Sequence, residues 1–93
     1  MRIIKAEKIE DCFDGSRIFL YSFEDCWNEV EINKLQKLGK LEYFRDFPRP
    51  FFRLITKDGM QVKGVEGDVS CRVIFPSDEQ NVIKQAFEEF FVS

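Results

Sequence analysis

The sequence contains no histidine, and that absence removes several kinds of chemistry at once. Without an imidazole, the chain cannot assemble a Ser–His or Cys–His catalytic pair or a histidine-ligated metal site from its own residues. Its three cysteines, Cys12, Cys26 and Cys71, are widely spaced and form no CxxC pair. We therefore expect neither a metal site nor a disulfide framework, and we interpret the cysteines as free thiols that fill small spaces in the core.

Long apolar segments are missing as well. The longest uninterrupted apolar run is Ile18-Phe19-Leu20-Tyr21, whereas a membrane-spanning helix needs about 20 apolar residues. The stretch that follows Met1 holds no apolar run of the length found in signal peptides. These features predict a cytoplasmic protein that has no membrane partner.

Groups of residues that would support catalysis are also scarce. No glycine-rich loop matches a phosphate-binding pattern. The adjacent carboxylates Glu24-Asp25 and Glu88-Glu89 would point apart on a helix or a strand, so neither pair faces one substrate. We therefore predict a protein that is not an enzyme, with no catalytic residues, no cofactor and no metal.

The composition is that of one small globular domain spanning residues 1–93, with 44% hydrophobic and 33% charged residues and a net charge of −3. The charge is distributed unevenly: residues 1–31 carry four basic and eight acidic side chains, residues 32–75 carry nine and five, and residues 76–93 carry one and four. A basic middle between acidic ends fits an anion-binding face, or self-complementary charge that stabilises the fold or a dimer. The negative net charge favours the second interpretation.

The first third of the chain predicts a β-hairpin. Residues 17–23 are aromatic and branched and are apolar on both faces, which is typical of a central strand. Asp14-Gly15 favours a two-residue type I′ turn, so residues 3–9 are the expected antiparallel neighbour.

Residues 25–41 then predict a helix, with Asp25 or Asn28 as its N-cap and Gly39 just beyond its C-terminal end. The alternation of residues 29–32 leaves open a short strand followed by a helix capped at Asn33.

Beyond this helix, residues 41–50 predict an extended connector or an edge strand, because Pro48 and Pro50 end a helix and cannot donate ladder hydrogen bonds. Strands near 51–57, 60–65 and 69–75 follow as a meander. The last helix opens with a capping box formed by Ser77 and Gln80, and the acidic Asp78 and Glu79 lie at its positive end. Its predicted apolar stripe comprises Val82, Ile83, Ala86, Phe87, Phe90 and Phe91.

This order of elements predicts an α+β domain, a mainly antiparallel sheet with two helices packed on one face. The architecture resembles a ferredoxin-like fold with permuted strand order, ββα-βββ-α, in which the usual last strand comes first.

Turn lengths predict which side chains share a face. A two-residue loop at Asp58-Gly59 pairs Ile55 with Val62, and a two-residue loop at Gly67-Asp68 pairs Gly64 with Cys71. The helix-covered face then holds Phe51, Ile55, Met60, Val62, Val69, Cys71, Val73 and Phe75. The opposite, open face holds Phe52, Leu54, Thr56, Gln61, Lys63, Val65, Ser70, Arg72 and Ile74, and it brings the cations Lys63 and Arg72 directly opposite each other.

Like charges facing each other across two strands are unfavourable, and a mixed, open sheet face is rarely left bare. We therefore predict a small non-enzymatic interaction or ligand-binding domain that forms a homodimer, or binds another protein partner, through this face. The predicted surface comprises Phe52, Lys63 and Arg72, with Arg45, Arg49 and Tyr21 as outlying members.

Two alternatives stay open. Residues 43–53 interleave aromatic rings with arginines, as in modules that bind single-stranded nucleic acid, although the pI near 5.0 and the absence of an RNP1 motif disfavour this function. A competing interpretation is that Phe44, Phe47 and Phe51 fill the core beneath a proline-stiffened crossover. The other alternative is a regulatory domain that senses a small anion or an amino acid.

Overall fold

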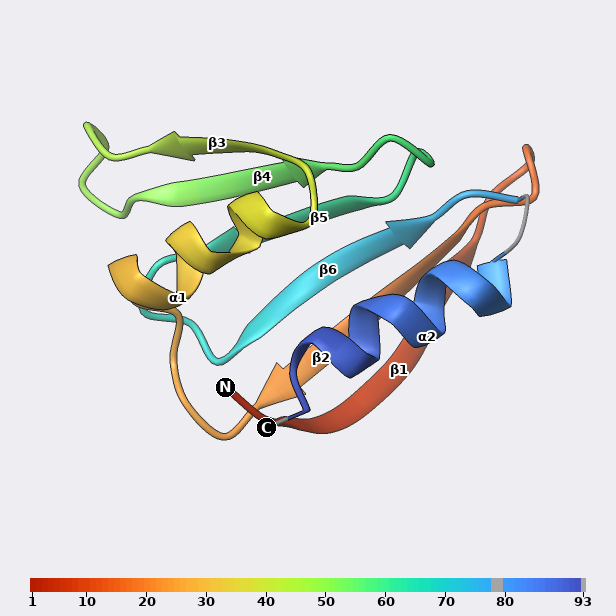
Figure 1. Cartoon of the computed structure of the whole chain (residues 1–93), viewed down its shortest axis with the longest axis horizontal. Coiled ribbons are helices and arrows are strands. Elements are labelled where there is room, and N and C mark those ends of the chain that lie inside the picture. The colour runs from red at the N-terminus through yellow and green to blue at the C-terminus, as the bar shows by residue number, and fades with distance from the viewer. Residues whose placement is uncertain (78–79, 93) are drawn as a thin grey trace.

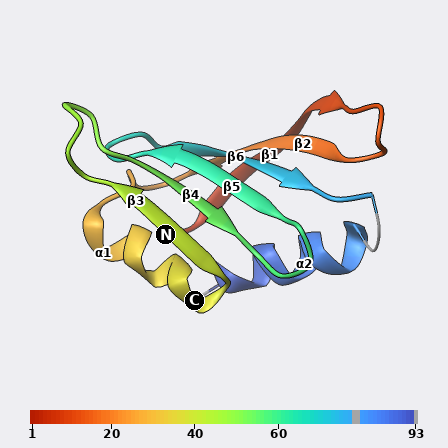
Figure 2. The same ribbon diagram turned by 90° about the horizontal axis from the view of Figure 1, so that it is seen from above.

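The computed structural model describes residues 1–77 and 80–92 and shows a small two-layer α+β domain (Figure 1). Six antiparallel strands form one sheet in the order β1-β2-β6-β5-β4-β3. Both helices lie on the same face of this sheet, and no helix covers the other face within the described part of the chain (Figure 2). The elements are β1 (Ile3–Asp11), β2 (Arg17–Phe23), α1 (Glu29–Lys34) continued by a 3₁₀ turn (Leu35–Lys37), β3 (Lys40–Phe44), β4 (Phe51–Ile55), β5 (Gln61–Val65), β6 (Ser70–Phe75) and α2 (Gln80–Phe90).

The core lies between the sheet and the helices and is largely aromatic. The Trp27 ring, just ahead of α1, packs 5.3 Å from Phe23 and 4.8 Å from Phe52 (centroid distances). On α2, the Phe87 ring packs 5.0 Å from that of Tyr21. The aromatic side chains therefore join both helices to strands from both halves of the sheet.

The segment between β2 and β3 differs from the predicted long helix. Asn28 is the N-cap, and its side chain accepts a hydrogen bond from the Glu31 N–H at 2.9 Å. Residues 29–32 are helical, so the strand alternative is wrong. Gly39 does not have the left-handed conformation of a C′ residue. It is required for close approach instead, because a Cβ there would lie 2.5 Å from the Ile55 carbonyl oxygen.

The meander has four strands rather than the predicted three. Lys40–Phe44, predicted partly as the end of the helix and partly as an extended connector or an edge strand, forms the edge strand β3 and pairs antiparallel with β4. Its alternation supports this: Leu41 and Tyr43 pack against the core, while Lys40 lies on the opposite side and is exposed. The prolines follow β3 in the loop before β4.

Both Asp-Gly hairpin loops contain three residues instead of the predicted two. The N–H of Cys12 donates to the Ser16 carbonyl at 2.9 Å, and the N–H of Thr56 donates to the Met60 carbonyl at 3.0 Å. In each loop the third residue is a glycine with positive φ, 89° at Gly15 and 94° at Gly59. This is the geometry of a type I turn followed by a glycine bulge.

The additional loop residue shifts the β4–β5 register by one. Leu54 lies opposite Val62, and Arg53 lies opposite Lys63, whereas the predicted partner of Val62 was Ile55. A one-residue shift moves every side chain of a strand to the other face. The predicted β5–β6 register is confirmed, with Lys63 opposite Arg72.

The shift decides which phenylalanine of β4 enters the core. Phe52 is 1% exposed and belongs to the core cluster, so its predicted place on the open face is wrong. Leu54 is buried as well. Phe51, Arg53 and Ile55 occupy the alternate positions and lie on the open face.

The last helix carries its predicted apolar stripe, since Ile83, Phe87 and Phe91 are buried. Val82 and Val69, which were expected to face the core, are exposed. The predicted acidic residues of the helix N-terminus, Asp78 and Glu79, lie outside the described residues. Among the described helices, none has the length and apolar character needed to cross a membrane.

Candidate ligand-binding face

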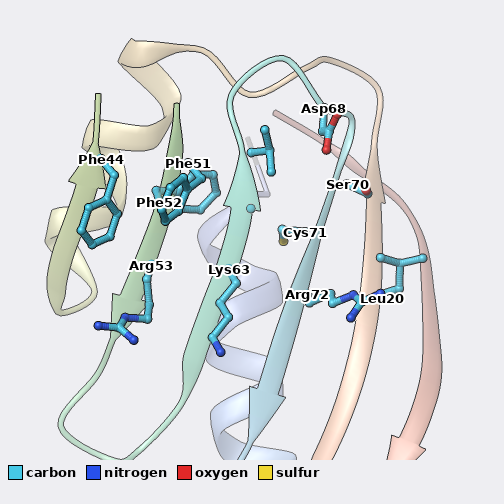
Figure 3. Close-up of a pocket in the computed structure, with 12 residues that line it drawn as sticks. Leu20, Phe44, Phe51, Phe52, Arg53, Lys63, Asp68, Ser70, Cys71 and Arg72 are labelled. Atoms are coloured by element: carbon cyan, nitrogen blue, oxygen red, sulfur yellow. The ribbon is translucent and has the colours of Figure 1, made fainter. Parts of the chain in front are cut away.

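A row of three cations crosses the centre of the open face. Arg53 on β4 lies opposite Lys63 on β5, and Lys63 lies opposite Arg72 on β6. Figure 3 shows the three side chains on these neighbouring strands. Neighbouring strands are about 4.8 Å apart, so the side chains of this cationic row repel one another across the sheet.

The row is neutralised at one end only. The guanidinium of Arg53 binds the carboxylate of Glu42 on β3, at 2.8 Å from Nε and 2.6 Å from Nη2. Lys63 and Arg72 form no salt bridge with any residue that the structure describes, and both are exposed. Beyond Arg72 the row continues with the apolar Leu20 on β2. Two adjacent positive charges are therefore left without a counter-charge.

Three phenylalanines lie beside the row. The rings of Phe44 on β3 and Phe51 on β4 are stacked, with centroids 4.7 Å apart and planes inclined by 22°. Phe47, from the loop between these strands, packs 5.1 Å from Phe51 and is 52% exposed. The prediction that these three rings fill the core is wrong, since they form a phenylalanine platform on the open side.

A hollow of about 650 Å³ lies between the cationic row and the phenylalanine platform (Figure 3). It extends over Gly64, whose lack of a side chain leaves room for the ring of Phe52. The residues that line it are Leu20, Phe44, Phe51, Phe52, Arg53, Lys63, Gly64, Val65, Asp68, Ser70, Cys71 and Arg72.

Most of the outlying residues of the predicted surface lie away from this hollow. Tyr21 is 0% exposed, and its hydroxyl donates to Glu88 on α2 at 2.6 Å. Arg45 pairs with Glu29 at 3.0 Å and does not line the hollow. Arg49 pairs with Asp68, a lining residue, at 2.7 Å, which places Arg49 at the rim.

The sequence interpretation missed Arg53 and the phenylalanine platform as parts of this face. The missed signal is the position of the glycine in Lys57-Asp58-Gly59, because a glycine at the third position of a hairpin loop favours the bulged, three-residue form. With that loop length, alternation places Phe51 and Arg53 beside Lys63 and Arg72.

Cys71, beneath the hollow, and Tyr43, on the core side of β3, both have a raised pKa. Burial raises the pKa of the Cys71 thiol, so this thiol is a poor nucleophile. Burial and a hydrogen bond to Glu66 raise the pKa of Tyr43 to about 12. Among the described residues, no group of three or more Cys, Asp or Glu side chains is arranged to hold a metal ion.

The chain was compared with models of protein families, with curated proteins and with solved structures, and none of them matches it.

Proposed function

We propose that this domain is a non-enzymatic binding module whose open sheet face takes up an anionic ligand that carries a flat apolar group. The observation that supports this most is the pair of uncompensated cations, Lys63 and Arg72, next to the stacked rings of Phe44 and Phe51. An anion supplies the charge that the cations lack, and the rings supply an apolar surface.

The anionic part of the ligand follows from the electrostatics of the row. Opposed like charges on a strand pair cost a few tenths of a kcal/mol to about 1 kcal/mol, and a bound anion removes this cost. Arg72 offers a planar fork of donors, which suits carboxylate, sulfonate or phosphate groups, while Lys63 adds a point charge. Ser70, which lines the same hollow, provides a hydroxyl.

The phenylalanine platform is the reason to expect a flat apolar group in the ligand. Rings that are stacked with each other still expose a face or an edge to a further ring, and Phe47 remains half exposed. The hollow of about 650 Å³ falls within the range of small-molecule sites. The ligand would lie flat across β4 and β5, with its charge toward β6.

A homodimer through the same face is the second candidate. On the other side of the cationic row, Ile18 lies opposite Ile74, and Gln61 lies between Ile74 and Ile55. The three isoleucines favour a dimer, because sheet faces with apolar side chains pack on one another. However, a two-fold axis through the centre of the face lays Lys63 of one copy near Lys63 of the other, and burying this contact is costly. The ligand-binding function therefore ranks first.

We also propose that the domain is cytosolic and that its fold is related to the ferredoxin-like fold. The three free cysteines favour a reducing, cytosolic environment. A ferredoxin-like arrangement with permuted strand order is supported by the strand order, in which β1 lies outside β2 and β6 lies next to β2. In this interpretation β4 and β5 are additional strands between β6 and β3.

Titration with the anionic dye anilinonaphthalene sulfonate tests the function. The dye should bind the folded wild type, and Lys63→Gln combined with Arg72→Gln should weaken binding by about tenfold or more. Lys57→Gln, in the exposed β4–β5 loop, is the matched control and should bind like the wild type. Equal binding by all variants would contradict the proposal. Sedimentation velocity of the same samples tests the dimer: a wild-type dimer that the dye dissociates would favour the second candidate.

A further inference from the structure

The phenylalanine platform and the cationic row both extend beyond what one small ring and one charge require. Three rings lie in series, since Phe51 contacts both Phe44 and Phe47. The cationic row covers three neighbouring strands, roughly 10 Å from Arg53 to Arg72 at the usual strand spacing. A ligand that uses both features carries more than one ring and more than one negative charge.

We propose that the ligand is a single-stranded nucleic acid whose bases stack on the phenylalanine platform and whose phosphates lie along the cationic row. This inference rests on the proposed function of the open face. Single strands are bound by this combination of a positive groove and aromatic side chains on which successive bases stack.

Polar groups at the two sides of the hollow orient the strand. Lys63 on β5 and Arg72 on β6 attract phosphate, and Asp68 at the rim of the hollow is already neutralised by Arg49 at 2.7 Å. Ser22 and Ser70 lie opposite each other on β2 and β6 and offer hydroxyls to sugar or phosphate oxygens beyond the row. The bases are therefore directed toward β3 and β4, and the backbone toward β5 and β6.

The acidic net charge does not oppose this arrangement, because many carboxylates lie away from the open face. Glu29 and Glu31 are on α1, and Glu88 and Glu89 are on α2, all in the helical layer. Charges beyond a Debye length of about 8 Å are largely screened at physiological salt. A phosphate at the row therefore interacts mainly with the three cations and with Glu42, and binding is expected to be weak and sensitive to salt.

The platform also favours single strands over duplexes. A base in a duplex is paired and stacked on both sides, so its flat surface is not available to Phe44 or Phe51. No helix lies over the open face to form a wall there within the described residues, so a chain can enter and leave the hollow at both ends (Figure 2).

Fluorescence anisotropy with a labelled oligothymidylate of about a dozen nucleotides tests the inference. The wild type should bind it, and the logarithm of the affinity should fall linearly with the logarithm of salt concentration between about 50 and 200 mM. Lys63→Gln and Arg72→Gln should each lower the magnitude of this slope by about 0.7, since each removes one phosphate contact, and Lys57→Gln should leave it unchanged. Phe51→Ala should weaken binding roughly 5- to 150-fold. Phe13→Ala, at a fully exposed position in the β1–β2 loop, is its control and should have no effect.

Four results would overturn the inference, and they separate it from the proposed function. If the dye binds at Lys63 and Arg72 but the oligonucleotide does not bind at about 100 µM protein, the nucleic-acid ligand is wrong and the anion-binding function stands. If thymidine monophosphate competes as well as the oligonucleotide, the ligand is a mononucleotide. If a duplex of the same length binds equally well, the platform takes no part. If neither the dye nor the oligonucleotide binds, the proposed function fails as well.

Discussion

The adjacent residues Phe51 and Phe52 provide the sharpest test of the strand register. Phe52 is 1% exposed, its ring packs 4.8 Å from that of Trp27, and the lack of a side chain at Gly64 makes room for it. Replacing such a phenylalanine with alanine removes buried area and leaves a cavity. Phe52→Ala should therefore lower the free energy of unfolding by about 3–5 kcal/mol, a large part of the roughly 5–15 kcal/mol of a typical domain.

Phe51→Ala should cost much less. Its ring is only partly buried and packs against Phe44 and Phe47 on the open face, so the loss is mainly that of two aromatic pairs, about 0.5–1.5 kcal/mol each. Urea unfolding, followed by far-UV circular dichroism and by the fluorescence of the single tryptophan, measures both variants. A loss for Phe51→Ala that equals or exceeds the loss for Phe52→Ala would refute the register and the open face built on it.

A variant at Gly64, on the neighbouring strand β5, tests the packing of the Phe52 ring from the other side of the contact. A Cβ at this position would lie 2.5 Å from Cζ of Phe52, so Gly64→Ala should destabilise the protein by about 1–3 kcal/mol through overpacking. Combining it with Phe52→Leu should restore part of the loss, because the smaller side chain vacates the contact. Strictly additive effects in this double-mutant cycle would show that the two positions are not in contact.

Three further predictions follow from single contacts. Lys63→Glu places a carboxylate between two arginines, so it should raise the free energy of unfolding by a few tenths of a kcal/mol to about 1 kcal/mol at low salt. The same variant should no longer bind the dye. If urea unfolding shows that the variant is less stable than the wild type, the cations of the row do not repel one another. Phe87→Ala should cost about 3–5 kcal/mol, since the ring is 1% exposed, and a near-neutral effect on thermal unfolding would contradict the packing of α2. Burial, together with the hydrogen bond to Glu88, raises the pKa of Tyr21, so the folded state holds this phenol proton more tightly than the unfolded chain. The resulting stability is present below pH 10, the ordinary pKa of tyrosine, and is lost as the pH rises above it. Tyr21→Phe should reduce this alkaline loss of stability in melting curves recorded at several pH values. A variant with the same pH dependence as the wild type would contradict this role of Tyr21.

Local patterns in the sequence were sufficient for several elements. The capping ability of Asn28 predicted a helix after β2, which is shorter in the structure than predicted, and the apolar stripe around Phe87 predicted α2. The two-sided apolar character of residues 17–23 predicted a central strand, and β2 does pair on both sides. The register of β5 with β6, and with it the opposition of Lys63 and Arg72, also followed from the sequence.

The face of β4 was not decided by its own residues. Phe51 and Ile55 on one side are as apolar as Phe52 and Leu54 on the other, so alternation favours neither face. The choice depends on one additional residue in the Lys57-Asp58-Gly59 loop.

Contacts from elsewhere in the chain support that choice. The space over Gly64 admits the ring of Phe52, and Trp27 packs against this ring from the helical layer. Only the assembled sheet and helix therefore determine that Arg53 joins Lys63 and Arg72, and that Phe51 stacks on Phe44. The sequence by itself determined the α+β class and two cations of the candidate site. The rest depended on tertiary packing, because the apolar pattern of β4 is symmetric and only partners distant in sequence distinguish its two faces.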